Sequence, residues 1–124
     1  MEHKMAKILV VDDEIYIREL IKRALSTRGH TIIDFDNGID GIKYVKENSV
    51  DVAIIDLVMP MKGGIETLIE IRDSNRKIKI IAISGKIETK ADAIQGLAQQ
   101  FNVDKVLSKP FDVDEIIQIV EELI

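Results

Sequence analysis

The sequence predicts an α/β domain in which five parallel strands alternate with five helices. Short apolar runs such as Ile8–Val11 alternate along the chain with longer stretches whose apolar residues recur at helical spacing. Short, continuous apolar runs are typical of strands that are buried on both faces. Strands that alternate with helices usually pair in parallel, and the helices then cover both faces of the sheet.

The first half of the chain contains three predicted strands and two predicted helices. The strands are expected at Ile8–Val11, Thr31–Phe35 and Val52–Ile55. The first helix is indicated by apolar residues at helical spacing, namely Ile17, Leu20, Ile21, Ala24 and Leu25. Gly29 lies just past this helix and is typical of a helix end. Asn37–Gly38 breaks the second strand, and Ile42 and Val45 indicate a short second helix.

The second half contains three predicted helices and two predicted strands. A loop with Pro60, Gly63 and Gly64 precedes the third helix, which is indicated by Ile65, Leu68, Ile69 and Arg72. The strands are expected at Ile78–Ile83, which is the most β-branched segment, and at Val106–Leu107. The fourth helix is indicated by Ala91, Ile94, Leu97 and Ala98, although Gly96 weakens it. Asp112 is expected to cap the last helix, whose inner face carries Ile116, Ile117, Val120 and Leu123.

Length and composition limit the classes of protein to consider. The 124 residues suffice for one ordinary domain, which is expected at 7–124 after a tail at 1–6. The net charge of −5 argues against direct binding of nucleic acid, which would require a basic face. The absence of cysteine excludes disulfides and cysteine-based zinc sites. The absence of cysteine also fits a cytoplasmic location, which we expect. No apolar run approaches the roughly 20 residues of a membrane helix, so we expect no membrane insertion.

Polar residues that carry chemistry follow four of the five predicted strands. Asp12–Asp13 follows the first strand, Asp56 the third, Ser84 the fourth and Lys109 the fifth. Ligands of open α/β sheets bind outside the carboxyl ends of the strands, so we expect these groups to converge at one edge. The acidic residues after the second strand, Asp34 and Asp36, are set aside as less specific.

A cluster of carboxylates requires compensation by positive charge. Two like charges about 4 Å apart repel by roughly 4 kcal/mol at an effective dielectric constant near 20. Mg²⁺ prefers oxygen ligands, so Asp12 and Asp13 are candidates to bind it while Asp56 faces the metal ion. An aspartate carboxylate can act as a nucleophile toward a phosphoryl group. Lys109 would neutralise the spreading negative charge, and the Ser84 hydroxyl would donate to another phosphoryl oxygen.

Each of these residues also has a simpler structural interpretation. Asp13 is a candidate cap for the first helix, Asp56 and Ser84 could be ordinary loop residues, and Lys109 a solvated lysine before a turn. Their occurrence together at four strand ends favours the functional interpretation. Residues away from this edge are interpreted as solvated or locally hydrogen-bonded (His3 and His30) or as a solvated face (Lys86, Lys90 and Lys105).

Four motifs together resemble the receiver domains of two-component response regulators. They are Ile8–Glu14, Asp56–Pro60, Ser84 after an apolar strand, and Ser108–Phe111, and they lie in order over nearly the whole chain. The chain is similar to the stand-alone members, of which the chemotaxis response regulator is one. The resemblance implies a five-stranded, doubly wound, flavodoxin-like sheet with the strand order 2-1-3-4-5 and five helices.

The resemblance also implies roles for individual residues. Asp56 corresponds to the phosphoacceptor, and Asp12 and Asp13 to the acidic pair that binds Mg²⁺ with Asp56. The backbone carbonyl of Val58 corresponds to a further metal ligand. Ser84 corresponds to the switch hydroxyl. Lys109 corresponds to the family's lysine and is expected to precede a cis peptide bond to Pro110, a bond type in which cis geometry costs little.

The implied partners are a histidine kinase or a histidine phosphotransfer protein as donor, and an unknown downstream protein. Such a protein is no enzyme beyond its own phosphorylation and dephosphorylation, and many members dimerise when phosphorylated. The sequence shows no output domain, so the signal is expected to pass to another protein. The corresponding output face would carry Lys90, Gln95, Gln99, Lys105 and Gln118.

Three positions depart from the family pattern. Val106 replaces the switch aromatic, so rotation of an aromatic ring cannot report phosphorylation. Lys62-Gly63-Gly64 follows the loop proline, where many members carry Met-Asp-Gly. Val58 lacks a polar group to orient an attacking water, and Lys86 could shield the phosphoryl group. We therefore expect a phosphorylated form that decays slowly.

Three alternatives remain at this stage. The first is a binding module with this fold that never accepts phosphate; Val106 gives it some support, and the intact set of Asp12–Asp13, Asp56, Ser84 and Lys109 argues against it. The second is a phosphatase of the haloacid dehalogenase class, although its second acidic residue is replaced by Val58. The third is a dinucleotide or flavin binder, which the absence of a Gly-x-Gly-x-x-Gly motif disfavours.

Overall fold

A single parallel sheet forms the centre of the molecule. The structure is a computed structural model, and it describes residues 4–59, 63–75, 77–85, 96 and 99–124. Its strands are β1 (Lys7–Val11), β2 (Thr31–Phe35), β3 (Val52–Asp56), β4 (Lys79–Ser84) and β5 (Lys105–Ser108). They pair in parallel in the order β2-β1-β3-β4-β5, which confirms the expected topology.

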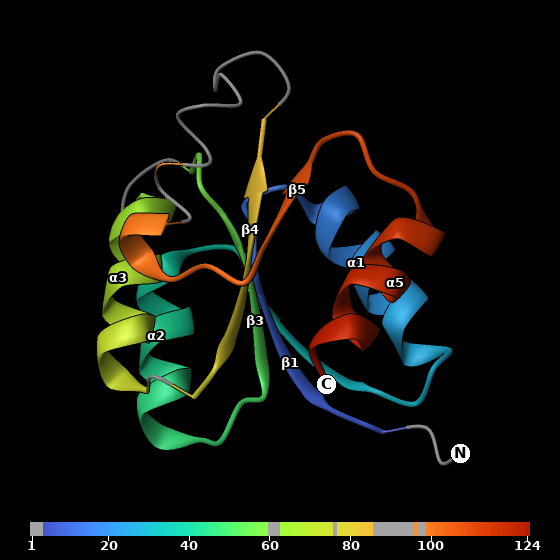
Figure 1. The fold of residues 1–124 in the computed structure, drawn as a ribbon, viewed down its shortest axis with the longest axis horizontal. Coiled ribbons are helices and arrows are strands. Elements are labelled where there is room, and N and C mark those ends of the chain that lie inside the picture. The colour runs from blue at the N-terminus through green and yellow to red at the C-terminus, as the bar shows by residue number, and fades with distance from the viewer. Residues whose placement is uncertain (1–3, 60–62, 76, 86–95, 97–98) are drawn as a thin grey trace.

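Helices cover both faces of this sheet (Figure 1). They are α1 (Ile15–Ser26), α2 (Gly38–Glu47), α3 (Gly64–Ser74) and α5 (Val113–Leu123). Residues 96 and 99–101 are also helical, within the segment predicted as the fourth helix. Most of that segment, and the predicted loop at 86–89, lie outside the described residues. The helices α1 and α5 pack on one face, and α2 and α3 on the other.

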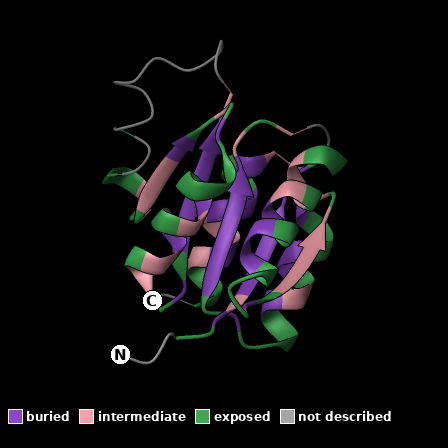
Figure 2. Cartoon of the chain, turned by 90° about the vertical axis from the view of Figure 1, so that its right-hand side faces the viewer, coloured by how far each residue is buried: buried purple, intermediate pink, exposed green. Residues whose placement is uncertain are grey.

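Successive side chains along a strand point to opposite faces of the sheet, and this explains why both faces of the sheet are apolar. On β1, Ile8 and Val10 join the core cluster beneath α1 and α5, whereas Leu9 and Val11 join the cluster beneath α2 and α3. Every residue of β3 is buried. The edge strands β2 and β5 are only partly buried, and this difference is visible in Figure 2. The strand that carries Asp56 is therefore held rigidly from all sides.

The first and last helices, α1 and α5, begin with different caps. The N-cap of α1 is Glu14, without a side-chain cap, so the interpretation of Asp13 as a helix cap is wrong. The amide of Glu14 donates instead to Asp12 Oδ1 at 2.8 Å. Asp112 caps α5 as predicted, and Glu115 completes a capping box.

His30 is buried, so the prediction of a solvated or locally bonded histidine is wrong. Its Nδ1 accepts from the Ala6 amide at 3.0 Å, and its Nε2 lies 3.2 Å from Glu121 Oε2 on α5. Ala6, which the sequence assigns to the tail, is itself part of the core cluster beneath α1. These contacts tie the start of β1 to the last turns of α5.

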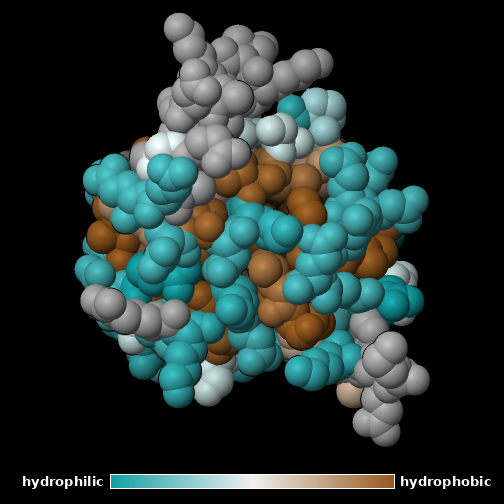
Figure 3. All heavy atoms as spheres, viewed as in Figure 1, coloured by the Kyte–Doolittle hydropathy of each residue, from teal (hydrophilic) through white to brown (hydrophobic). Residues whose placement is uncertain are grey.

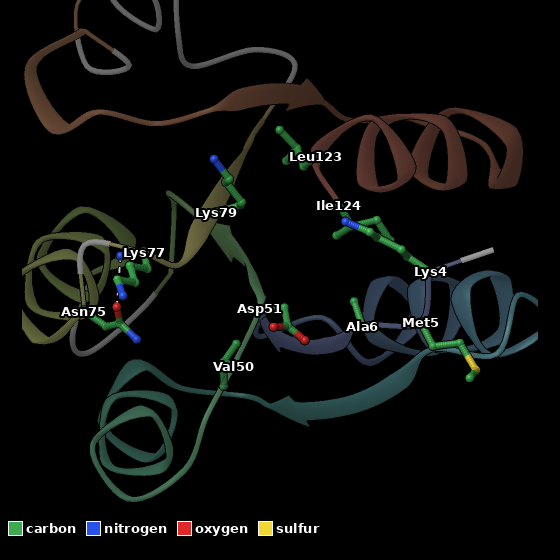
Figure 4. Close-up of a pocket in the computed structure, with 10 residues that line it drawn as sticks. All are labelled: Lys4, Met5, Ala6, Val50, Asp51, Asn75, Lys77, Lys79, Leu123 and Ile124. Carbon is green, nitrogen blue, oxygen red and sulfur yellow. Dashed lines mark hydrogen bonds between the residues drawn. The ribbon is translucent and has the colours of Figure 1, made fainter. Parts of the chain in front are cut away.

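The space-filling view shows apolar residues along the middle of one face, with hydrophilic side chains on either side (Figure 3). A hollow of about 510 Å³ lies at the amino ends of the strands (Figure 4). Lys4, Lys77 and Lys79 line it together with apolar residues that include Ala6 and Leu123. None of the four carboxyl-end groups predicted from the sequence lines this hollow.

Two neighbouring glycines give a test of the packing beside β3. A Cβ atom on Gly64 would lie 1.8 Å from the backbone oxygen of Asp56, whereas a Cβ on Gly63 would meet nothing within 4 Å. Gly64→Ala is therefore expected to lower the free energy of unfolding by about 2 to 3 kcal/mol. Gly63→Ala, the control, should leave it unchanged or raise it by up to about 1 kcal/mol. Urea unfolding measures both, and equal effects would contradict the close approach.

Candidate metal and phosphoryl site

The pairing of β1 with β3 places two aspartates side by side. Val11 is opposite Ile55, so Asp12 and Asp56 lie at neighbouring strand ends. Both residues are buried. Each uses one carboxylate oxygen to fix its own loop, because Asp12 Oδ1 accepts from the Glu14 amide and Asp56 Oδ1 accepts from the Val58 amide at 3.0 Å. The second oxygen of each aspartate remains for other partners.

Lys109 is the cation that faces these free oxygens. Its Nζ lies 3.1 Å from Asp56 Oδ2 and 3.3 Å from Asp12 Oδ2. It also lies 2.9 Å from Glu14 Oε1. The Lys109 amide donates to the Ser84 carbonyl at 2.9 Å, so β4 and β5 position the lysine across the sheet. One ammonium group therefore contacts three carboxylates and compensates only part of their charge.

The geometry fits a divalent cation. Asp12, Asp13, Glu14 and Asp56 each offer a carboxylate oxygen, and these oxygens lie within 4.8 Å of one another. Asp12 Oδ2 is buried and accepts no hydrogen bond with good geometry from the described residues, since its contact with Lys109 is an ion pair only. Four carboxylates against one ammonium leave excess negative charge. An all-oxygen site of this kind suits Mg²⁺.

Burial changes the acidity of the site. It raises the pKa of Asp12 to about 6; the Glu14 amide opposes the shift, and the neighbouring charge of Asp56 adds to it. Burial likewise raises the pKa of Asp56, against the opposing effects of the Val58 amide and Lys109. The pKa of Lys109 is raised: burial acts against the shift, and the hydrogen bond to Glu14 and the charges of Asp12 and Asp56 outweigh it. The lysine is therefore charged throughout the physiological range.

Ser84 lies at the same edge but in a different setting. It is buried at the end of β4, and its Oγ lies 3.4 Å from the Oγ of Ser108 on β5. Asp56 pairs with Ile83, so Ser84 extends one residue farther along the sheet than Asp56. The hydroxyl contacts neither carboxylate among the described hydrogen bonds. Its role toward a phosphoryl group stays a prediction.

The structure tests some of the expectations from the family resemblance and leaves others open. The Lys109–Pro110 peptide bond is cis, as expected. Val106 lies opposite Ala82 in the sheet and is half-buried. The carbonyl of Val58 as a metal ligand stays a prediction. Lys86 lies outside the described residues.

The structure thus brings Asp12, Asp13, Asp56 and Lys109 into one cluster and places Ser84 at the same edge. The sequence reasoning assigned no role to Glu14, although its position directly after Asp12–Asp13 was a usable signal. It also assigned none to Ser108. The set-aside Asp34 forms ion pairs with Arg18 and Lys22 instead of joining the cluster.

Comparison with known proteins decides against two of the three alternatives. The family profile described as "Response regulator receiver domain" matches residues 8–121. The chain belongs to the response regulator receiver domain family. The phosphatase and dinucleotide-binder alternatives are thereby set aside, and the chain is a receiver domain of two-component signal transduction.

Several proteins of known name or structure are similar to this receiver domain. It is 33% identical to the chemotaxis protein CheY of Bacillus subtilis, over 94% of this chain and 95% of that protein. It is also 33% identical to the solved response regulator TrrA of Thermotoga maritima, covering 97% of this chain and all of that one, with a TM-score of 0.82. A receiver domain from Methanospirillum hungatei is 30% identical with a TM-score of 0.81, covering 97% of this chain and 94% of that one.

Other relatives are longer than this receiver domain. The chain is 30% identical to the transcriptional regulatory protein DltR of Streptococcus agalactiae over 90% of its own length, and it spans 48% of DltR. It spans 54% of the probable C4-dicarboxylate response regulator DctR of Bacillus subtilis, at 33% identity over 98% of this chain. The chain therefore spans about half the length of these relatives. In the described part of the chain, no helix is both long and apolar enough to cross a membrane.

The buried Asp12 makes the stability of the metal-free receiver domain depend on pH. Folding raises the pKa of Asp12 from 3.8 to about 6, so the folded state holds the proton more tightly than the unfolded chain. The charged form therefore lowers stability above about pH 6, and the penalty disappears as the pH falls toward about 4. Asp12→Asn should raise the free energy of unfolding at neutral pH by about 1 to 2 kcal/mol without Mg²⁺.

Urea unfolding in the presence of a chelator measures this gain at several pH values. The gain should shrink as the pH falls from 7 to about 4.5. Asp13→Asn is the matched control, because Asp13 is exposed, and its effect should stay within about 0.5 kcal/mol. A gain that is the same at every pH would show that the Asp12 charge is not its source.

Proposed function

We propose that Asp56 accepts a phosphoryl group from a phosphohistidine of a histidine kinase or a histidine phosphotransfer protein. The observation that carries this proposal is the contact of the buried Asp56 carboxylate with Lys109 at 3.1 Å, beside three further carboxylates. Burying an aspartate near other acidic groups destabilises the fold unless a cation compensates its charge. The role of a nucleophile beside an ammonium group and a cation site would explain why this charged aspartate is kept, and it fits the receiver family.

In the proposed reaction, a carboxylate oxygen of Asp56 attacks the phosphorus atom. The bond between phosphorus and the donor nitrogen breaks, and the histidine nitrogen keeps the electron pair. Lys109 stands where it can donate to a phosphoryl oxygen, because its Nζ already contacts the Asp56 carboxylate. The amide of Val58 holds Asp56 Oδ1 and so orients the carboxylate. Ser84 is proposed to donate its hydroxyl to another phosphoryl oxygen.

Asp12, Asp13, Asp56 and the Val58 carbonyl are proposed to hold Mg²⁺. Bound Mg²⁺ would offset the negative charge that spreads over the phosphoryl oxygens. The solved TrrA structure is described as a complex with Mg²⁺–BeF, which supports the proposal of an equivalent ion in the present chain. The excess of carboxylates over ammonium groups in the cluster supports the same proposal.

The proposed signal leaves through Ser84 and Lys109. A phosphoryl group adds up to about two negative charges, which draws both side chains toward it. Two existing conformations then shift in population. Of the predicted output face, Lys105 pairs with Glu122 at 3.0 Å and Gln118 donates to the same carboxylate. An unknown downstream protein, or a second copy of the chain, is proposed to bind there after phosphorylation; Lys90 and Gln95 lie outside the described residues.

The wider setting of the domain is also proposed. Residues 7–124 would form the receiver domain and residues 1–6 a tail whose last residue, Ala6, packs into the core, with a cytoplasmic location. Its chemistry would be limited to its own phosphorylation and dephosphorylation.

Incubation with Mg²⁺ and acetyl phosphate tests the acceptor. The intact mass should increase by one phosphoryl group in the wild type and stay unchanged in Asp56→Asn, because the amide cannot form the acyl phosphate. Asp73→Asn is the control, since Asp73 is an exposed carboxylate on α3, and it should be labelled like the wild type. Labelling of Asp56→Asn, or none of the wild type, would contradict the proposal.

Decay of the labelled protein tests the role of Val58. Its side chain is 48% exposed and offers no polar group to orient an attacking water. Val58→Asn should therefore lose its label on the order of tenfold faster than the wild type, because an amide could position that water. Val58→Leu keeps the position apolar and should decay like the wild type. Equal decay of all three proteins would remove Val58 as a cause of slow hydrolysis.

A further inference from the structure

The ammonium group of Lys109 is shared among three carboxylates. A lysine side chain carries three N–H donors and no acceptor. Its Nζ lies 2.9 Å from Glu14 Oε1, 3.1 Å from Asp56 Oδ2 and 3.3 Å from Asp12 Oδ2. Glu14 and Asp56 accept hydrogen bonds from the ammonium group, and Asp12 faces it as an ion pair without a hydrogen bond. A phosphoryl group on Asp56 would therefore compete with these carboxylates for Lys109.

The three partners differ strongly in their access to water. The side chains of Asp12 and Asp56 are 0% and 3% exposed, whereas that of Glu14 is 54% exposed. A buried carboxylate that loses its cation keeps an uncompensated charge, which is strongly unfavourable. An exposed carboxylate is rehydrated at little cost. Glu14 is therefore the partner that Lys109 releases most easily.

We propose that Glu14 is an exchangeable partner of Lys109, which holds the ammonium group in the resting state and is replaced by the phosphoryl group. This inference rests on the proposed phosphorylation of Asp56. Glu14 acts through Lys109 and is a positioning residue. Its carboxylate competes with the phosphoryl group for Lys109, so it lowers the affinity of the site for that group and favours the resting state.

The charge of Glu14 acts in opposite directions on a cation and an anion. Its carboxylate oxygen belongs to the cluster whose atoms lie within 4.8 Å of one another, so it strengthens the attraction for Mg²⁺. The same charge repels a phosphoryl group and competes with it for Lys109. Removing the charge should therefore weaken cation binding and strengthen anion binding. Loss of general stability would weaken both.

Glu14→Gln removes the charge with little change of shape. Titration with Mg²⁺ alone, followed by beryllium fluoride at saturating Mg²⁺, gives the two dissociation constants from amide NMR shifts. We expect Mg²⁺ to bind about twofold more weakly and beryllium fluoride about threefold more tightly than in the wild type. Glu19→Gln is the control, because Glu19 is an exposed glutamate on α1 outside the cluster, and both constants should stay unchanged.

Glu14→Asp separates the contact from the charge. The shorter side chain keeps the negative charge but loses the length with which Glu14 reaches Lys109. If the contact matters, beryllium fluoride should bind this variant more tightly than the wild type. Wild-type affinity in Glu14→Asp would overturn the exchange and leave only a general effect of charge. Weaker binding of beryllium fluoride to Glu14→Gln would overturn it as well.

Phosphorylation by acetyl phosphate distinguishes the two levels of the proposal. If the wild type is labelled on Asp56 but Glu14→Gln binds beryllium fluoride like the wild type, only the role of Glu14 fails. If the wild type takes no label and binds no beryllium fluoride, the phosphoacceptor function fails, and the exchange fails with it. Labelling together with the expected shifts supports both.

Discussion

Asp12 directly follows β1, and the neighbouring strand β3 ends at Asp56, so the pairing of these two strands forces both carboxylates into a region with little water. Each aspartate turns one oxygen to its own loop and the other to Lys109. The start of α1, the loop after β3 and the lysine after β5 are all positioned by these few contacts. Removing the ammonium group would leave buried carboxylates without compensation, at a cost of several kcal/mol.

The sheet could be predicted from the sequence to a large extent, because continuous apolar runs coincide with buried strands. The observed and predicted strand bounds differ where polar residues pair with a neighbouring strand. The predicted strand Val106–Leu107 extends from Lys105 to Ser108, because these two residues pair with Ile81 and Ser84 of β4. Local periodicity does not determine which strands become neighbours. The strand order therefore came from the family resemblance and not from apolar spacing.

The site was predictable as far as the strand ends determine it. Parallel strands place their carboxyl ends at one edge, so Asp12, Asp56 and Lys109 had to converge. The contact of Glu14 with Lys109 depends on where α1 begins and on the length of a side chain, which a sequence pattern does not contain. His30 was misjudged for a similar reason, because its partners Ala6 and Glu121 lie 24 and 91 residues away along the chain.

Because β3 is completely buried, the backbone of Asp56 and the side chain of Glu14 move on very different timescales. The backbone that carries Asp56 lies in the middle of the sheet, so its amides exchange with solvent only when most of the fold opens, which in small domains takes from seconds to days. The exposed side chain of Glu14 can change its rotamer within about a nanosecond. The nucleophile is therefore as persistent as the fold itself, whereas the pairing of its lysine can be renewed many times during a single encounter with a phosphoryl donor.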